Sequence, residues 1–247
     1  MINSDTLYAQ ASLAQAAYAE ALAAGSPVGV LKEQLKDDAD FAETQATAFA
    51  ADFAVVLQYN DSIAEGGLDT GLSLTVFRDK ATNALTLAIR GTSPSDVRDL
   101  LTDGDIFVGG AGYDQIVALF NWWQRASTAA GPVPQYFFVL DNTFYPDALP
   151  VGGGYLARTH DASATGTLVA ALAAGGGRVD VTGHSLGGHL AMAFQALFPR
   201  HGVDLSSEDP ITGVAAANDV AFAGVPRSGC TGQLLASRCS SVACGGV

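Results

Sequence analysis

Hydrophobic and polar residues alternate in three short stretches of the chain, and such alternation is the spacing of a half-buried β-strand. Residues 72–76 read Leu-Ser-Leu-Thr-Val, residues 85–89 read Leu-Thr-Leu-Ala-Ile, and residues 179–182 read Val-Asp-Val-Thr. The polar segment at 78–83 predicts a turn between the first two stretches, so we expect an antiparallel hairpin there. Residues 133–140 are predominantly apolar, which is typical of a buried parallel strand.

Apolar residues spaced three or four apart predict helices in other parts of the chain. Residues 5–24 are rich in alanine and end at a Gly-Ser-Pro sequence that stops a helix. A second helical region covers residues 30–58, with a break near its two adjacent aspartates at 37–38. Residues 115–125 form an amphipathic helix whose paired tryptophans we expect in core or edge packing, with a lipid anchor as the alternative. The pattern turns helical again at 159–174, after a long irregular connection at 141–158.

These elements predict a single α/β domain over residues 1–225, because a chain of 247 residues can bury one sizeable core. Within it, residues 1–60 form a helical N-terminal segment. Residues 226–247 differ from the rest, since their apolar residues follow neither the spacing of a strand nor that of a helix. They also hold all three cysteines of the chain. We interpret them as a tail foreign to the fold, on a chain that is cut short. A disulfide framework is the weaker alternative, because three cysteines leave one thiol free.

The strand at 179–182 leads directly into Gly-His-Ser-Leu-Gly at 183–187, and apolar residues then recur at helical spacing until Pro199. A strand, a tight turn with one serine and a helix, in this order, form the nucleophile-elbow pattern, which holds a serine hydroxyl clear of the sheet. A side chain at position 183 or 187 would crowd the approach of strand and helix. Ser185 is therefore the candidate nucleophile. The alternative is an ordinary turn in a chain with 28 glycines.

A serine that attacks an ester needs fixed hydrogen-bond donors for the oxyanion that forms. One is commonly the amide after the nucleophile, and another comes from a loop after an early strand. Leu186 follows the serine, and Thr92 follows the strand at 85–89 in the sequence Ile-Arg-Gly-Thr. The backbone N–H groups of these two residues are the candidate donors, with the Thr92 hydroxyl as a third. An ordinary turn residue is the alternative interpretation of Thr92.

The Ile-Arg-Gly-Thr segment at 89–92 and the Gly-His-Ser-Leu-Gly-Gly segment at 183–188 resemble those of the class 3 lipase family. Within that family, the alanine-rich N-terminus and the acidic body are similar to bacterial calcium-dependent lipases and phospholipases with repeat tails. The resemblance covers residues 70–200. It implies an α/β-hydrolase fold with a mostly parallel central sheet flanked by helices, and hydrolysis of carboxylic esters of lipids. It also implies that Ser185 is the nucleophile and Thr92 the oxyanion residue.

A serine hydroxyl is a weak nucleophile at neutral pH, so it needs a histidine base that a carboxylate orients. After Ser185 the chain offers His189, one turn into the helix, and His201, roughly 20 Å away at the far end of that helix. Neither reaches the serine easily, so the base is unassigned and His201 is kept as its candidate; His160 is expected on the surface. Asp219, after the next expected strand, is the candidate acid, and a turn or helix cap is its alternative role.

The formal net charge of −13 disfavours nucleic acid and anionic membrane surfaces as partners. The mechanism requires no metal, and the chain has no His/Cys cluster for zinc. Calcium is suggested by the acidic balance and the family resemblance. Its candidate ligands, for which a solvated loop is the alternative, are Asp96, Asp99, Asp103 and Asp105. The same segment, 96–108, is apolar between its acids and is a candidate lid beside the oxyanion loop, with a packed surface loop as the alternative.

No apolar run reaches the roughly 20 residues of a membrane span, so we expect a protein that is not transmembrane. The N-terminus lacks the basic and apolar regions of a signal peptide, which leaves export by another route open. The sequence therefore predicts a carboxylic ester hydrolase, a lipase or esterase, acting on a small-molecule or lipid ester, with a lipid–water interface as a possible place of action. The alternatives are a catalytically impaired lipid-binding remnant and a phospholipase A1-type, acyltransferase or peptide-hydrolysing activity.

Overall fold

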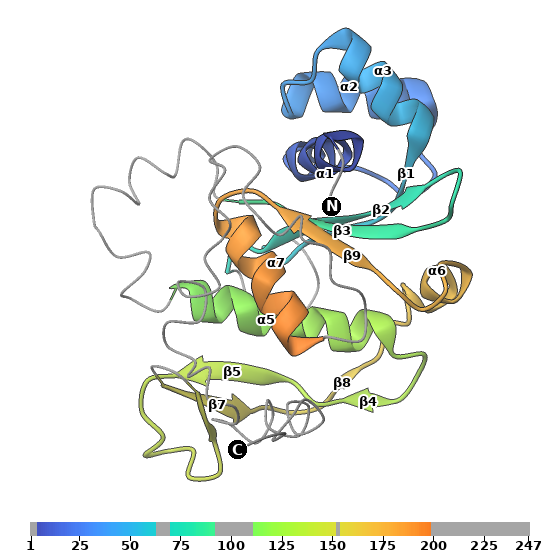
Figure 1. Ribbon diagram of the computed structural model, residues 1–247. Coiled ribbons are helices and arrows are strands. Elements are labelled where there is room, and N and C mark those ends of the chain that lie inside the picture. Colours follow the sequence, from blue (N-terminus) through green and yellow to red (C-terminus); the bar gives the residue numbers. More distant parts are fainter. Residues whose placement is uncertain (1–3, 63–69, 92–110, 152–153, 199–247) are drawn as a thin grey trace, which may run out of the picture.

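The computed structural model describes residues 4–62, 70–91, 111–151 and 154–198 of the 247-residue chain (Figure 1). The tail at 226–247 lies outside these ranges. The helices are α1 (Ser4–Ala16), α2 (Val28–Asp38), α3 (Glu43–Asp52), α5 (Ala111–Ser127), α6 (Val169–Ala174) and α7 (Leu186–Leu197). The strands are β1 (Phe53–Asn60), β2 (Ser73–Asp79), β3 (Leu85–Ile89), β4 (Pro132–Val133), β5 (Tyr136–Val139), β6 (Leu149–Val151), β7 (Gly154–Arg158), β8 (Ala162–Ser163) and β9 (Asp180–Gly183).

A four-stranded sheet with the order β1-β2-β3-β9 forms the middle layer (Figure 1). Strands β2 and β3 make the antiparallel hairpin that the alternation predicts, with Leu74 opposite Ile89 and Val76 opposite Leu87. Strand β1 also pairs with β2 in the antiparallel sense, whereas β9 pairs with β3 in parallel. The described sheet is therefore mixed, and the prediction of a mostly parallel sheet does not hold for it. Helices combined with this mixed sheet give the general α/β class that the sequence predicts.

Helices cover both faces of the central sheet, with α1, α2 and α3 on one side and α5 and α7 on the other (Figure 1). The alternation along β2 explains the two cores: Val76 packs in the cluster with α5 and α7, while its neighbour Phe77 packs with the N-terminal helices. Both side chains are fully buried. Trp122 and Trp123 are 6% and 1% exposed, so of the predicted core or edge packing the structure shows the core.

A second sheet, three-stranded with the order β5-β7-β6, lies next to α5 (Figure 1). Both of its pairings are antiparallel, so the prediction of a buried parallel strand at 133–140 is wrong, and 141–158 is not irregular throughout. Asn121 of α5 explains this position. Its side-chain amide donates to the Tyr136 carbonyl (2.6 Å) and accepts from the Tyr136 N–H (3.0 Å). The amide satisfies the backbone of β5 as a neighbouring strand would, and it ties β5 to α5.

The N-terminal segment is less helical than predicted. Helix α1 ends at Ala16 rather than near residue 24, and the predicted helical region at 30–58 ends in the strand β1. The side chain of Gln58 in β1 accounts for part of both differences. Its amide accepts a hydrogen bond from the Leu22 N–H (2.8 Å) and donates one to the Ala19 carbonyl (2.7 Å). A longer helix would pair these backbone groups internally, but here a strand side chain satisfies them.

The helix predicted at 159–174 is limited to α6, and the short strand β8 precedes it. Gly166 has a φ of +62°, a left-handed conformation that interrupts a helix. The N–H groups of Thr165 and Gly166 donate to the Arg125 carbonyl near the end of α5, at 2.9 and 3.2 Å. The backbone of this segment is therefore bonded to a neighbouring helix instead of to its own previous turn.

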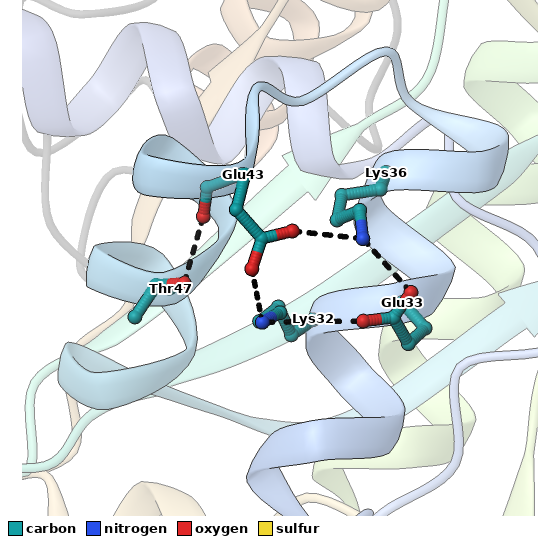
Figure 2. A network of polar contacts seen from close by, with 5 residues as sticks. All are labelled: Lys32, Glu33, Lys36, Glu43 and Thr47. Atoms are coloured by element: carbon teal, nitrogen blue, oxygen red, sulfur yellow. Dashed lines mark hydrogen bonds and ion pairs between the residues drawn. The ribbon is translucent and has the colours of Figure 1, made fainter.

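A charged network joins α2 to α3 (Figure 2). Helix α2 ends at Asp38, where the sequence predicts a break in this helical region. Glu43 contacts the Lys32 ammonium and lies 2.8 Å from that of Lys36, which is 2.9 Å from Glu33. The Thr47 hydroxyl donates to the Glu43 carbonyl within α3 (Figure 2). Hydrogen bonds from Lys32 and then Lys36 lower the pKa of Glu43 from 4.5 to about 2. The Glu43 side chain is 58% exposed, so water and salt weaken this network.

We expect Glu43→Gln to lower Tm slightly at neutral pH, because the variant loses ion pairs that solvent screens. The folded-state pKa of Glu43 is lowered, so the carboxylate stabilises the fold above about pH 4.5 and loses this effect as the pH falls toward about 2. The difference in Tm between wild type and variant should narrow across that window in thermal melts followed by circular dichroism. Asp37→Asn is the control, since this exposed acid of α2 has no ion pair within the described residues. A difference that stays constant with pH would contradict the prediction.

Candidate active site

Ser185 lies in the turn between β9 and α7, directly before the first residue of the helix. Its backbone has φ 54° and ψ −124°, a conformation that residues with a Cβ atom rarely adopt. Such a residue carries about 1–3 kcal/mol of strain and persists only where its surroundings fix it. The residue is exposed to solvent although the strand before it is largely buried. The strand, strained turn and helix are thus arranged as the nucleophile-elbow pattern predicts.

Two glycines allow the strand and the helix to approach each other at this turn. A Cβ atom at Gly183 would lie 2.3 Å from the carbonyl carbon and oxygen of Gly187. A Cβ atom at Gly187 would lie 2.1 Å from the Ile89 carbonyl oxygen of β3. Each distance is far below van der Waals contact with backbone that has no room to move. The sequence-based expectation that side chains at 183 and 187 would crowd the elbow is therefore confirmed.

The end of β3 packs against the same turn. A Cβ atom at Gly91 would lie 2.4 Å from the His184 carbonyl oxygen and 3.3 Å from the Ser185 Cβ. Gly91 is the last described residue before the next gap, so the candidate oxyanion residue Thr92 itself lies outside the described residues. The structure does place the preceding residue, Gly91, which contacts the turn around Ser185.

Leu186, the other candidate oxyanion donor, is the first residue of α7. The N–H groups of Gly187 and Gly188 donate to the carbonyls of His184 and Ser185, both at 2.9 Å. The N–H of Leu186 stands before these, at a helix position that has no acceptor within the helix. A helix N-terminus also carries partial positive charge, which favours an anion placed next to it. This geometry suits an amide that binds a developing oxyanion beside Ser185.

His184 is half-buried, and its Nδ1 lies 3.0 Å from the Tyr18 hydroxyl, with which it forms a hydrogen bond. Tyr18 follows α1, and the two residues are 166 positions apart. The sequence reasoning missed Tyr18 altogether. Periodicity and motif spacing report on neighbours along the chain, so they contain no signal for a contact over this separation.

His189 contacts Ser185 through its backbone. Its backbone N–H donates to the Ser185 carbonyl (3.2 Å), as in an ordinary helix turn. Its ring instead lies toward α5, where the Nε2 atom is 3.7 Å from the place that a Cβ on Gly112 would take. Burial lowers the pKa of His189, so the neutral ring is favoured. Within the described ranges, no histidine is hydrogen-bonded to the Ser185 hydroxyl.

The other candidates are either exposed or beyond what the structure describes. His160 is exposed, as predicted. His201 and Asp219 lie outside the described residues, so the general base and the acid of the mechanism stay predictions. Phe144, in the connection between β5 and β6, is 85% exposed, as expected for a surface loop. Tyr145 beside it is 40% exposed.

The candidate calcium ligands and lid share one segment, 96–108, which lies outside the described residues. Among the residues that are described, no three His, Cys, Asp or Glu side chains are grouped so that they could hold a metal ion. None of the described helices combines the length and the apolar character needed to cross a membrane. Calcium and a lid therefore remain predictions from the sequence.

No model of a known protein family, no curated protein and no solved structure matches this chain. The chemistry of the site is therefore inferred from the residues around Ser185 and from the resemblance of two short segments. Of these, the segment at 183–188 lies wholly within the described residues, and that at 89–92 is described as far as Gly91.

Proposed function

We propose that the protein is a serine esterase or lipase with an α/β-hydrolase fold, which hydrolyses carboxylic esters of lipids through an acyl-Ser185 intermediate. The observation that carries this proposal is the backbone of Ser185, strained at φ 54° and ψ −124° and exposed at a strand-to-helix turn. An ordinary turn has no need of this conformation, since a glycine at the same place would remove the strain. A nucleophile that must project from the sheet edge does need it.

In the proposed reaction, the Ser185 hydroxyl oxygen attacks the ester carbonyl carbon while a general base takes the hydroxyl proton. The carbonyl oxygen becomes an oxyanion, which accepts hydrogen bonds from the Leu186 and Thr92 N–H groups. The carbon–oxygen bond to the alcohol then breaks, and the alcohol leaves with the proton that the base returns. Water attacks the acyl carbon in the second step while the base takes a proton from the water. The bond between the acyl carbon and the Ser185 oxygen then breaks, the base returns the proton to that oxygen, and the carboxylic acid leaves.

The direct test is covalent labelling with a fluorophosphonate probe, followed by peptide mass spectrometry. We expect a single modified residue, Ser185, because an activated serine reacts with such a probe and an ordinary serine does not. Ser163→Ala, at an exposed serine of β8, should label as the wild type does. Heat-unfolded protein should not label, since the turn is then lost. Absence of labelling on folded protein would contradict the proposal and favour the lipid-binding remnant.

Substrate class is tested separately with a series of p-nitrophenyl esters of increasing acyl length beside a p-nitroanilide of matched acyl group. The proposal expects turnover of the esters and little turnover of the amide, with a preference for longer acyl chains. Equal rates on ester and amide would favour a peptide-hydrolysing enzyme on the same scaffold. Adding a calcium chelator to these assays tests whether turnover depends on calcium, the metal that the acidic segment 96–108 suggests.

A further inference from the structure

The N-terminal layer touches the elbow through Tyr18. The hydroxyl of this residue is hydrogen-bonded to His184 Nδ1 at 3.0 Å, and the two ring centroids are 6.2 Å apart. His184 directly precedes Ser185 in the turn. A residue from the first tenth of the chain therefore holds the peptide unit that determines where the serine lies.

The same hydroxyl also lies against the end of β3. A Cβ atom at Gly91 would come within 2.7 Å of the Tyr18 hydroxyl oxygen and within 2.4 Å of the His184 carbonyl oxygen. Two residues from Tyr18, the Glu20 carboxylate pairs with the Arg90 guanidinium at 3.2 Å. The segments around residues 18–20 and 90–91 thus run side by side, and both reach the serine turn.

Tyr18 is itself attached to a rigid support. Helix α1 packs on β9 and β3, the parallel pair that leads into the elbow. The Thr182 hydroxyl of β9 donates to the Gln10 carbonyl of α1 at 3.4 Å in the interior. Ala17, next to Tyr18, is 1% exposed and belongs to the core between the sheet and the N-terminal helices. A small movement of Tyr18 would therefore require this core to repack.

We propose that Tyr18 is a positioning residue for the ester hydrolysis: through His184 it fixes the strained turn, so that the Ser185 hydroxyl and the Leu186 N–H keep a constant relation to the end of β3. This inference rests on the proposed function. A strained backbone persists only when several contacts determine it, and Tyr18 supplies one of these contacts from outside the strand–helix unit, in addition to those from the end of β3. Catalysis is sensitive to such placement, because an error of about 1 Å can lower a rate about 100-fold.

Tyr18→Phe removes the hydroxyl and keeps the ring. We expect kcat for a p-nitrophenyl ester and the rate of fluorophosphonate labelling to fall about tenfold, while KM changes less than about twofold, because a positioning residue acts through His184 and not by binding the substrate. Tm should change little. The control is Tyr8→Phe, at a 62% exposed tyrosine of α1, for which we expect wild-type values. If Tyr18 serves only the fold, Tm falls and kcat per folded molecule does not, and the inference is overturned.

A double-mutant cycle with His184→Ala decides whether Tyr18 acts through His184. If it does, Tyr18→Phe lowers kcat in the wild-type background and has no further effect once His184 is alanine. Equal effects in both backgrounds would overturn the inference and leave the esterase proposal intact. Wild-type protein that does not react with the probe would overturn both. The four proteins are compared at equal folded fraction, determined from their thermal melts, so that a loss of stability is not read as a loss of rate.

Discussion

Replacing Ser185 with alanine is expected to lower kcat for a p-nitrophenyl ester by roughly 10⁴-fold or more. Alanine has no oxygen with which to form the acyl intermediate, so the two-step route is lost. The Leu186 N–H and the packing of the turn remain, and oxyanion binding alone leaves a residual rate of roughly 10³ to 10⁴ over the uncatalysed reaction. The measurement is initial-rate kinetics on purified protein, with active-site titration to correct for contaminating esterases.

Two controls keep this result interpretable. Ser163→Ala should retain the wild-type kcat, because Ser163 is exposed on β8 and belongs to no part of the site. Ser185→Ala should melt at nearly the wild-type Tm, since both residues carry a Cβ atom and meet the same backbone strain at φ 54°. An unchanged kcat in folded Ser185→Ala would end the hydrolase proposal and leave the mixed α/β fold as the only conclusion.

Gly187→Ala is expected to destabilise the fold by about 3 kcal/mol or more. The added Cβ atom would lie 2.1 Å from the Ile89 carbonyl oxygen and 3.0 Å from the Arg90 carbonyl carbon, so it meets backbone of the central sheet. A flexible side chain could move aside, but a sheet backbone has to shift as a whole, which costs more than ordinary overpacking. Urea unfolding followed by tryptophan fluorescence measures this loss, since the buried Trp122 and Trp123 lie in the same core.

The matched control is Gly29→Ala, for which we expect a gain in stability instead of a loss. Gly29 lies in the first turn of α2, and a Cβ atom there would meet no atom within 4 Å. Gly29→Ala should therefore stabilise the protein by up to about 1 kcal/mol, because alanine favours the helix. If both substitutions changed the free energy of unfolding by the same amount, close packing at position 187 would not be the cause, and the contact between the elbow and β3 would need revision.

The parts of the fold that the sequence predicts well are those set by neighbouring residues. The β2–β3 hairpin and the strand-turn-helix around Ser185 depend on alternation and on glycines within a few positions, and both are present in the structure. Strand β1 was missed because its residues also suit a helix by spacing, and only pairing with β2 and the Gln58 hydrogen bonds decide between the two. Tertiary contacts override local preference in such segments.

In the candidate site, too, the features set by neighbouring residues are predictable from the sequence and those set by distant contacts are not. The glycines at 183 and 187 reveal a tight turn because steric exclusion is local, and the structure gives the distances that justify them. Tyr18 could not be found from the sequence, since its contact with His184 spans 166 positions. The direction of β5 was equally hidden, because the Asn121 amide that ties it to α5 has no counterpart in strand periodicity.

The parallel pairing of β3 with β9 affects the order in which the molecule assembles. These strands are neighbours in the sheet, yet α5, the second sheet and α6 all lie between them along the chain. The β2–β3 hairpin can close early, whereas a pairing over so long a loop is slow. On the ribosome, the serine turn therefore takes its final conformation only after nearly all described elements have emerged. The proposed reactive serine is therefore not preformed in a nascent chain, and refolding protein should regain its circular dichroism signal before it regains labelling by the fluorophosphonate probe.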